Sequence, residues 1–263
     1  MKQIFRYLKF FPALPLLLGM GLSGVTFLTW QSLREAVQWV LNQTLNTQLQ
    51  ILSGQIQSQL NLHIHSLEQM ERRWNRSPQR NQSEWSADAQ GYVDFPGYQA
   101  IQWVDSTYVV RWIVPLASNE QALNYQNQLE KWLITLADAR RSRKTTISES
   151  INLVQGGKGF LVFIPVFPQG QFDGFITDVF HVEQFIDGAL PPIGHDEGHK
   201  HLKFGMRIWE NGEIIYDCVL PTWPQNRKQR LTLSSQKALP EINTPAPTWE
   251  IEIAPSPHLG IRI

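Results

Sequence analysis

The sequence has a single cysteine, Cys218, and no excess of charge of either sign. One cysteine excludes an internal disulfide framework and a thiolate-rich metal site. The 23 Lys and Arg residues balance the 23 Asp and Glu residues, so the chain has no basic field that would attract the phosphates of nucleic acid. The only dense basic run, at 140–144, is typical of the cationic last turn of a helix. We therefore expect no nucleic-acid partner.

The motifs of common catalytic sites are missing as well. There is no Gly-x-Ser-x-Gly elbow, no His-Glu-x-x-His motif and no kinase or cyclase signature. The glycine run at 156–159 lacks the spacing of a phosphate-binding loop, and it indicates a turn that enters a strand. Five residues of a polar stretch are of types that bind zinc or nickel, although linkers often collect such residues without binding metal: His195, Asp196, Glu197, His199 and His201. We expect no catalytic module, no metal and no cofactor.

What the sequence does contain is, first, an uncharged apolar run at 10–30, about long enough to cross a bilayer as a helix. Three cations precede the run and one follows it closely: Lys2, Arg6, Lys9 and Arg34. This asymmetry keeps the N-terminus in the cytoplasm. A cleaved secretory signal is the alternative, but no clear small-x-small cleavage site follows the run. We expect a cytoplasmic tail and a single-pass inner-membrane anchor over 1–30, with all later residues periplasmic.

Residues 31–76 have an apolar residue at every third or fourth position, the spacing of a helix with one apolar stripe. The stripe consists of Val37, Leu41, Leu45, Leu49, Leu52, Ile56, Leu60, Ile64 and Leu67. It suits pairing with a second helix, and packing on the chain's own domain explains it equally well. We expect a stalk helix that forms a homodimer. His63 and His65 fall on different faces of this helix, and we expect both at the surface.

From residue 77 to residue 190 the pattern changes to short strands. Two runs around a three-residue turn predict a β-hairpin over 100–113. Ser118 and Gln121 form a capping box, which predicts a helix that ends at the basic run. Two stronger strands follow, at 160–164 and 174–180, and a short amphipathic helix ends the region.

A polar linker at 191–203 separates this region from a second set of strands. Asn211-Gly212 is the dipeptide that most favours a tight β-hairpin turn, and alternating strands follow at 231–233 and 249–253. The predicted fold class is therefore α+β. It consists of a transmembrane helix and a stalk helix, followed by a membrane-distal lobe at 77–190 and a membrane-proximal lobe at 204–263.

Several motifs of the first lobe occur in the order and spacing of one known family. They are Ala139-Arg140, Thr145-Thr146-Ile147, Gln155-Gly156-Gly157-Lys158-Gly159-Phe160, Ile164-Pro165-Val166-Phe167, Gly174-Phe175 and Phe180-x-Val182-x2-Phe185-Ile186. The region from Phe95 to Leu190 resembles the CHASE sensory domain, the extracytoplasmic input of many histidine kinases and diguanylate cyclases. The resemblance implies a long helix followed by two PAS-like lobes, with the ligand in the membrane-distal one.

The resemblance also bears on individual residues. In cytokinin-binding members of the family a threonine borders the ligand pocket, and Thr146 matches it. Phe163, Pro165 and Phe167 match wall or strand positions. Those members hold their purine with a carboxylate on an earlier strand, and no matching acid lies near Val114-Pro115-Leu116.

A sheet with a helix across one face leaves a small concave site, which typically has apolar walls and a few polar groups. We predict ligand contacts from Trp103, Arg111, Trp112, Thr146, Phe163, Phe167 and Phe175. Each aromatic residue also fits a plain core position. Arg111 lies in an otherwise apolar strand, so its guanidinium needs a carboxylate, either the ligand's or that of Glu120.

The sequence thus predicts the sensory region of a membrane receptor for a small molecule, with the input part of a two-component histidine kinase as the leading interpretation. The alternative is a membrane-tethered periplasmic interaction or scaffold protein that has no small-molecule site.

Overall fold

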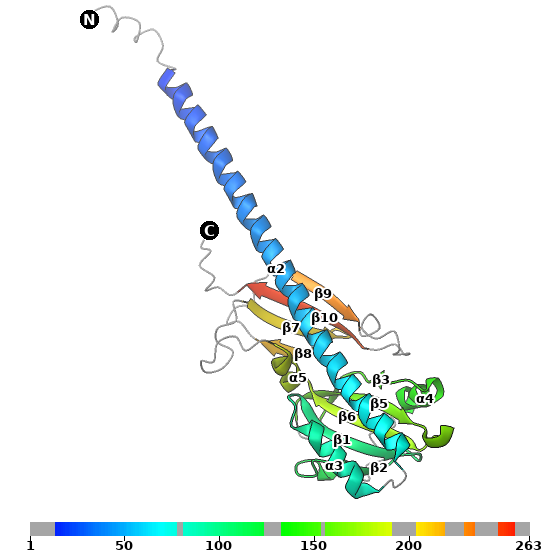
Figure 1. Cartoon of the computed structure of the whole chain (residues 1–263). Helices are drawn as coiled ribbons and strands as arrows, with labels where there is room; N and C mark the ends of the chain where they lie inside the picture. Colours follow the sequence, from blue (N-terminus) through cyan, green and yellow to red (C-terminus); the bar gives the residue numbers. More distant parts are fainter. Residues whose placement is uncertain are drawn as a thin grey trace, which may run out of the picture.

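The computed structural model describes residues 14–77, 81–123, 133–153, 156–190, 204–218, 229–234 and 247–255. Its longest element is α2 (Leu14–Arg76), one continuous helix of 63 residues (Figure 1). The predicted stalk and the described part of the predicted anchor therefore belong to the same helix. Within the described residues, none of the helices combines the length and the apolar character that crossing a membrane requires. Residues 10–13 of the apolar run lie outside the described residues.

A six-stranded antiparallel sheet, here called the larger sheet, lies against the C-terminal end of α2 (Figure 1). Its strands run in the order β2-β1-β6-β5-β3, and β4 also pairs with β5. The strands are β1 (Tyr98–Asp105), β2 (Val110–Val114), β3 (Thr146–Ile147), β4 (Ile151–Asn152), β5 (Lys158–Val166) and β6 (Gly174–His181). The predicted hairpin and the two strong strands are confirmed.

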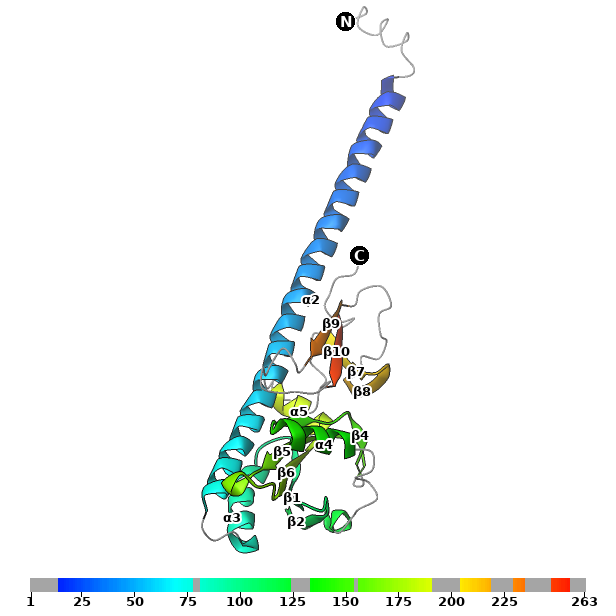
Figure 2. The ribbon, with the colours of Figure 1, turned by 90° about the vertical axis from the view of Figure 1, so that its right-hand side faces the viewer.

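A four-stranded antiparallel sheet, here called the smaller sheet, lies beside the middle of α2 (Figure 2). Its strands run in the order β8-β7-β10-β9, and they are β7 (Phe204–Glu210), β8 (Glu213–Cys218), β9 (Gln229–Ser234) and β10 (Thr248–Pro255). Asn211 and Gly212 join β7 to β8 with φ angles of 51° and 81°. Two positive φ angles are what a primed hairpin turn requires, so the turn prediction is confirmed.

Short helices lie around the larger sheet. They are α3 (Gln82–Val93), η2 (Glu120–Ala122), α4 (Leu133–Ser142), η4 (Pro168–Gly170) and α5 (Val182–Ala189). The α3 and α5 helices lie on the same face as α2, whereas α4 contacts β3 and β5 from the opposite face.

The apolar stripe of α2 packs on the chain's own sheets. From Leu41 to Leu67 every stripe residue is at most 7% exposed, and α2 contacts β5, β9 and β10. Burial of each such Leu or Ile side chain contributes about 1.5–3 kcal/mol. Of the two explanations left open by the sequence, packing on the chain's own domain accounts for the stripe from Leu41 onward. A second copy would have to use another face of α2.

The predicted capping box at Ser118 and Gln121 is wrong. Ser118 has a φ of 69°, and the structure has only the three-residue η2 helix there. Asn119 is the residue that precedes this helix, and its side-chain amide donates instead to the backbone oxygen of Pro115 at 2.9 Å. Of the helix predicted to end at the basic run, the structure describes α4. Residues 124–132 lie outside the described residues.

The surface position predicted for His63 is also wrong, whereas His65 is exposed. His63 lies on the buried side of α2, with its ring 4.7 Å from Tyr98 and 5.2 Å from Phe180, measured between centroids. Its Nδ1 lies 2.8 Å from the backbone oxygen of Gln59. Burial lowers the pKa of His63, so the ring packs as a neutral aromatic group.

Candidate ligand-binding face

The two faces of the larger sheet have different neighbours. One face packs on α2, α3 and α5, and the residues of this core include Ile101, Val162 and Phe180. The other, here called the outer face, carries Phe163 and Phe175 and is covered by α4. Since α2 occupies the first face, the outer face is where a ligand can meet the sheet without displacing the long helix.

Strand register places four residues in one row across the outer face. Gln102 pairs with Thr177, Thr177 pairs with Phe163, and Phe163 pairs with Thr146. Residues directly opposite each other in an antiparallel pair point to the same side of the sheet. The row therefore presents an amide, a hydroxyl, a phenyl ring and a second hydroxyl, with the two threonines roughly 10 Å apart across Phe163.

The hydroxyls of Thr146 and Thr177 are buried and have no hydrogen-bond partner among the described residues. Buried polar groups are paired in the great majority of cases, and an unpaired one costs about 1–3 kcal/mol. The two unpaired hydroxyls in one row make the outer face the candidate ligand-binding face.

The aromatic residues predicted for the site partly gather at this face. Phe163 and Phe175 are fully buried, with ring centroids 6.4 Å apart. Phe172 lies 5.0 Å from Phe175 and 5.5 Å from Phe167, and Tyr108 lies 6.0 Å from Phe175. The structure thus brings Thr146, Phe163 and Phe175 together, with Phe167 at the end of the group.

Trp103 and Trp112 lie on the other face, contrary to the prediction that they form walls with Phe163. They pair in register and stack at 5.8 Å. Trp74 of α2 lies 5.8 Å from Trp103, and Trp85 of α3 lies 5.7 Å from Trp112. Because successive residues of a strand alternate between faces, the outer row passes through Gln102 and leaves Trp103 facing the helices.

Arg111 has its carboxylate partner within the chain. Its side chain is 47% exposed, and Nε lies 2.5 Å from Asp105 Oδ2. Burial alone would raise the pKa of Asp105, but hydrogen bonds from Thr107, Arg111 and the Val109 backbone lower it. The partner is thus neither Glu120 nor a buried ligand group, and Arg111 sits at the hairpin end of the sheet.

Sequence reasoning missed Thr177 and Asp178. Thr177 lies in an apolar strand, and only the register of β6 with β5 places it beside Phe163. Asp178 faces α2 and is fully buried, with no hydrogen-bond partner for its side-chain oxygens among the described residues. Burial raises the pKa of Asp178 well above its usual value. The sequence signal that could have found both is a polar residue within an otherwise apolar strand.

The five metal-type residues at 195–201 lie outside the described residues. In the part of the chain that the structure describes, no three His, Cys, Asp or Glu side chains are grouped to hold a metal ion.

The family model of the CHASE domain matches residues 47–214, more than half of the chain. The chain belongs to the CHASE-domain family. The predicted identification is confirmed, and this CHASE domain is a sensory domain of the extracytoplasmic type. No curated protein matches the chain.

Several solved structures share the fold of this CHASE domain at low sequence identity. The ligand-binding domain of the Pseudomonas fluorescens chemoreceptor CtaA, in complex with L-leucine, has a TM-score of 0.57 and 13% identity, over 85% of this chain and 97% of that one. The Pseudomonas aeruginosa PctC domain with GABA has a TM-score of 0.53 and 13% identity, over 78% and 96%. An extracellular ligand-binding receptor from Desulfohalobium retbaense has a TM-score of 0.55 and 15% identity over 78% of this chain, which spans 40% of that receptor.

Proposed function

We propose that this CHASE domain is the ligand-sensing region of a membrane signal-transduction receptor, and that its ligand binds on the outer face of the larger sheet. The observation that carries the proposal is the pair of buried, unpaired hydroxyls of Thr146 and Thr177 on either side of Phe163. A small molecule that lies against Phe163 and hydrogen-bonds both threonines removes the cost of leaving them unpaired. Phe175 and Phe167 complete the proposed site, and Arg111 lies at its rim.

Amino acids are the first ligands to test, because chemoreceptor domains of the same fold were solved with L-leucine and with GABA. The experiment is isothermal titration calorimetry of the purified full chain against a library of amino acids and other small metabolites. We expect Thr146→Val or Thr177→Val to weaken the binding of a hit by about tenfold, the value of one hydrogen bond. Thr47→Val, at an exposed position of α2, is the matched control and should leave affinity unchanged. Binding that survives both outer-face substitutions would overturn the site.

We infer that the N-terminal part of the chain anchors it in the inner membrane. The uncharged run at 10–30 and the cations before it support this placement. In addition, the large apolar side chains of α2 from Leu17 to Trp30 are all at least half exposed, so the described chain does not cover them. Alkaline phosphatase and a fluorescent protein, each fused after Ile263, test the topology. The phosphatase should be active and the fluorescent protein dark, and the reverse pattern would contradict a periplasmic domain.

The output enzyme of the receptor is proposed to be a two-component histidine kinase, with a diguanylate cyclase as the other possibility, because CHASE domains serve as the input of such enzymes. Reading the coding sequence downstream of this segment and in adjacent genes tests this proposal. A kinase or cyclase encoded there supports it, and genes unrelated to signalling oppose it.

An interaction protein without a small-molecule site remains the second candidate, and the outward face of α2 is the observation that favours it. Leu33, Val40, Ile51 and Leu62 are exposed and spaced by 7, 11 and 11 residues, which places them on one face opposite the sheets. No Asp, Glu, Lys or Arg occurs at 36–67. Gly54 has open space at its Cβ position, with no atom of the described chain within 4 Å.

The same face can join two copies of the chain. Because this face is free of charge, two copies can meet along it without like-charge repulsion, and we propose a homodimer through it.

A further inference from the structure

The short segment at 145–150 contacts α4, β5, α2 and the smaller sheet. It contains β3, whose two residues pair only with β5 at the edge of the larger sheet. Ser148 extends this contact, because its N–H donates to Leu161 O at 2.8 Å and its Oγ accepts from Leu161 N at 2.9 Å. An edge strand with so few pairs is held weakly by its own sheet. Contacts outside this sheet therefore help to fix where Thr146 points.

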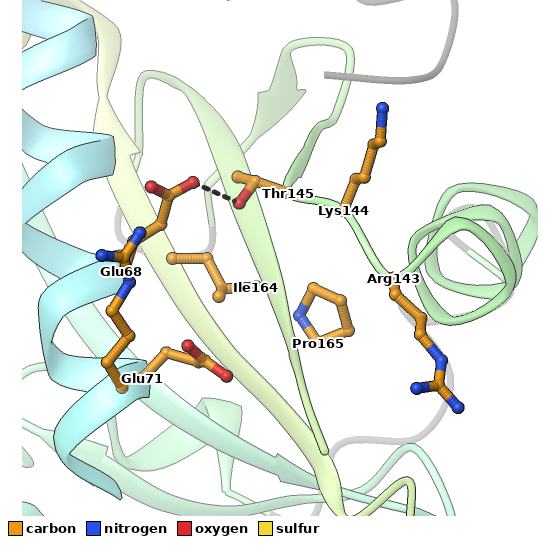
Figure 3. Close-up of a pocket in the computed structure, with 8 residues that line it drawn as sticks. Glu68, Glu71, Arg143, Lys144, Thr145, Ile164 and Pro165 are labelled. Carbon is orange, nitrogen blue, oxygen red and sulfur yellow. Dashed lines mark hydrogen bonds between the residues drawn. The ribbon is translucent and has the colours of Figure 1, made fainter. Parts of the chain in front are cut away.

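At one end, the segment is attached to α2. Thr145 immediately precedes β3, and its side chain reaches α2 on the face of the sheet opposite to that of Thr146. The Thr145 hydroxyl donates to Glu68 Oε1 of α2 at 2.9 Å, as Figure 3 shows. This bond borders a cavity of about 410 Å³ between α2 and the edge of the sheet, with Ile164 and Pro165 on its strand side.

At the other end, the segment is attached to the smaller sheet. Glu210 of β7 is 4% exposed, and its Oε2 accepts from the Ser150 N–H at 2.7 Å and also from the Ser150 hydroxyl. Its Oε1 accepts from Trp249 Nε1 at 2.9 Å. The next residue, Asn211, donates to Glu149 Oε1 at 3.1 Å. Hydrogen bonds to a buried carboxylate are stronger than those between neutral groups, so Glu210 is the firmest of these attachments.

We propose that Glu210 is a positioning residue for the candidate ligand site, although it belongs to the smaller sheet. By holding Ser150, it fixes the segment that carries Thr146 and presents the Thr146 hydroxyl beside Phe163. A ligand that moves Thr146 then acts through the same segment on α2 at Glu68 and on the smaller sheet at Glu210. This inference rests on the proposed function, because it gives Thr146 the role of a ligand contact.

The test follows the exposure of two buried positions on the outer face. Thr146→Cys and Thr177→Cys are made separately in the full chain with Cys218→Ser, so that each protein has one thiol. The probe is Ellman's reagent, and its reaction rate reports how often each position opens to solvent. Thr177 lies two strands from β3 in the same row, so the thiol at position 177 reports opening of the sheet away from the 145–150 segment.

We expect Glu210→Gln to increase the reaction rate of the thiol at position 146 at least tenfold and to change that at position 177 less than twofold. Glu213→Gln is the matched control, since it removes an exposed carboxylate of the same hairpin that bonds Lys158 Nζ at 2.7 Å. It should leave both rates within twofold. If Glu210→Gln does not fold, Ser150→Ala removes only the hydroxyl donor and should act in the same direction with a smaller increase.

An unchanged rate at position 146, or equal increases at positions 146 and 177, would overturn the proposal, because the second result means general loosening of the domain. The assay contains no ligand, so its failure is distinguishable from failure of the calorimetric screen. With a ligand from that screen, Glu210→Gln should weaken binding at least fivefold and Glu213→Gln should not.

Discussion

Thr145 and Thr146 are neighbours in the sequence, but their hydroxyls have opposite surroundings. Thr145 donates to Glu68, whereas Thr146 has no partner among the described residues. We expect Thr146→Val to raise the free energy of unfolding by about 0.5–2 kcal/mol, because an isosteric methyl group removes an unpaired polar atom. Thr145→Val should lower it by about 1 kcal/mol, because it leaves the Glu68 carboxylate without its donor. Urea unfolding of the ligand-free chain measures both, and shifts of the same sign would contradict this account.

The buried carboxyl of Asp178 makes stability depend on pH. Its pKa is raised well above its usual 3.8, so the folded chain keeps this proton at pH values where the unfolded chain has lost it. The contribution of Asp178 to stability therefore falls as pH rises through about 4 and continues to fall until the folded pKa is passed. Tyr98 and His63 lie on the same side of the sheet, and no cation from α2 pairs with this carboxyl among the described residues.

Asp178→Asn removes this titration. Relative to the unsubstituted chain, the variant should gain stability as the pH rises above about 4 toward pH 7. Urea unfolding at several pH values measures the difference. Glu213→Gln, an exposed carboxylate, serves as the control and should leave the pH dependence nearly unchanged. A constant offset for Asp178→Asn across this range would contradict a raised pKa.

The residues of the candidate site were only partly predictable from the sequence. Thr146 and Phe163 followed from the family motifs, and the structure places them side by side. Thr177 could not be found, because a polar residue in an apolar strand acquires a meaning only when strand register assigns it a neighbour. Trp103 and Phe163 were predicted to line one site, but they lie on opposite faces, since the sequence alone does not say which side of a strand meets α2.

Among the elements, α2 has two apolar faces with different roles. Ile64 is fully buried against the sheets, and Leu62 is 60% exposed on the outward face. We expect Ile64→Ala to destabilise the fold by about 2–5 kcal/mol, because it leaves a cavity under the helix. Leu62→Ala should change the free energy of unfolding by no more than about 0.5 kcal/mol in the monomer. Equal losses for both variants in urea unfolding at low protein concentration would contradict the assignment of the two faces.

Elements set by local chemistry were predictable, and those set by distant contacts were not. The β7-β8 hairpin followed from Asn211-Gly212, whose preference for positive φ is intrinsic to these residues. The capping box at Ser118 failed because Asn119 bonds the Pro115 carbonyl and the Gln99 side chain, which the helix pattern does not reveal. For the same reason, no sequence pattern indicated that Glu210 would meet Ser150.

At the scale of the whole molecule, the outward face of α2 predicts how two copies meet. In the full chain with Cys218→Ser, Ile51→Cys should form a disulfide-linked dimer in membranes under mild oxidation. Asn46→Cys, about 140° around the helix, should form far less. The reason is that Ile51 shares the uncharged face with Val40 and Leu62. Equal crosslinking at both positions, or none at position 51, would contradict a dimer along this face.

The continuity of α2 has a mechanical consequence. Its 63 residues form a rod about 95 Å long at a rise of about 1.5 Å per residue. Both sheets hold this rod from Leu41 onward, and its N-terminal part projects beyond them (Figure 2). A rotation of α2 where the sheets hold it therefore displaces its N-terminal part. The arm from Leu14 to Leu41 is about 40 Å long, so a tilt of about 3° about Leu41 moves its tip by about 2 Å.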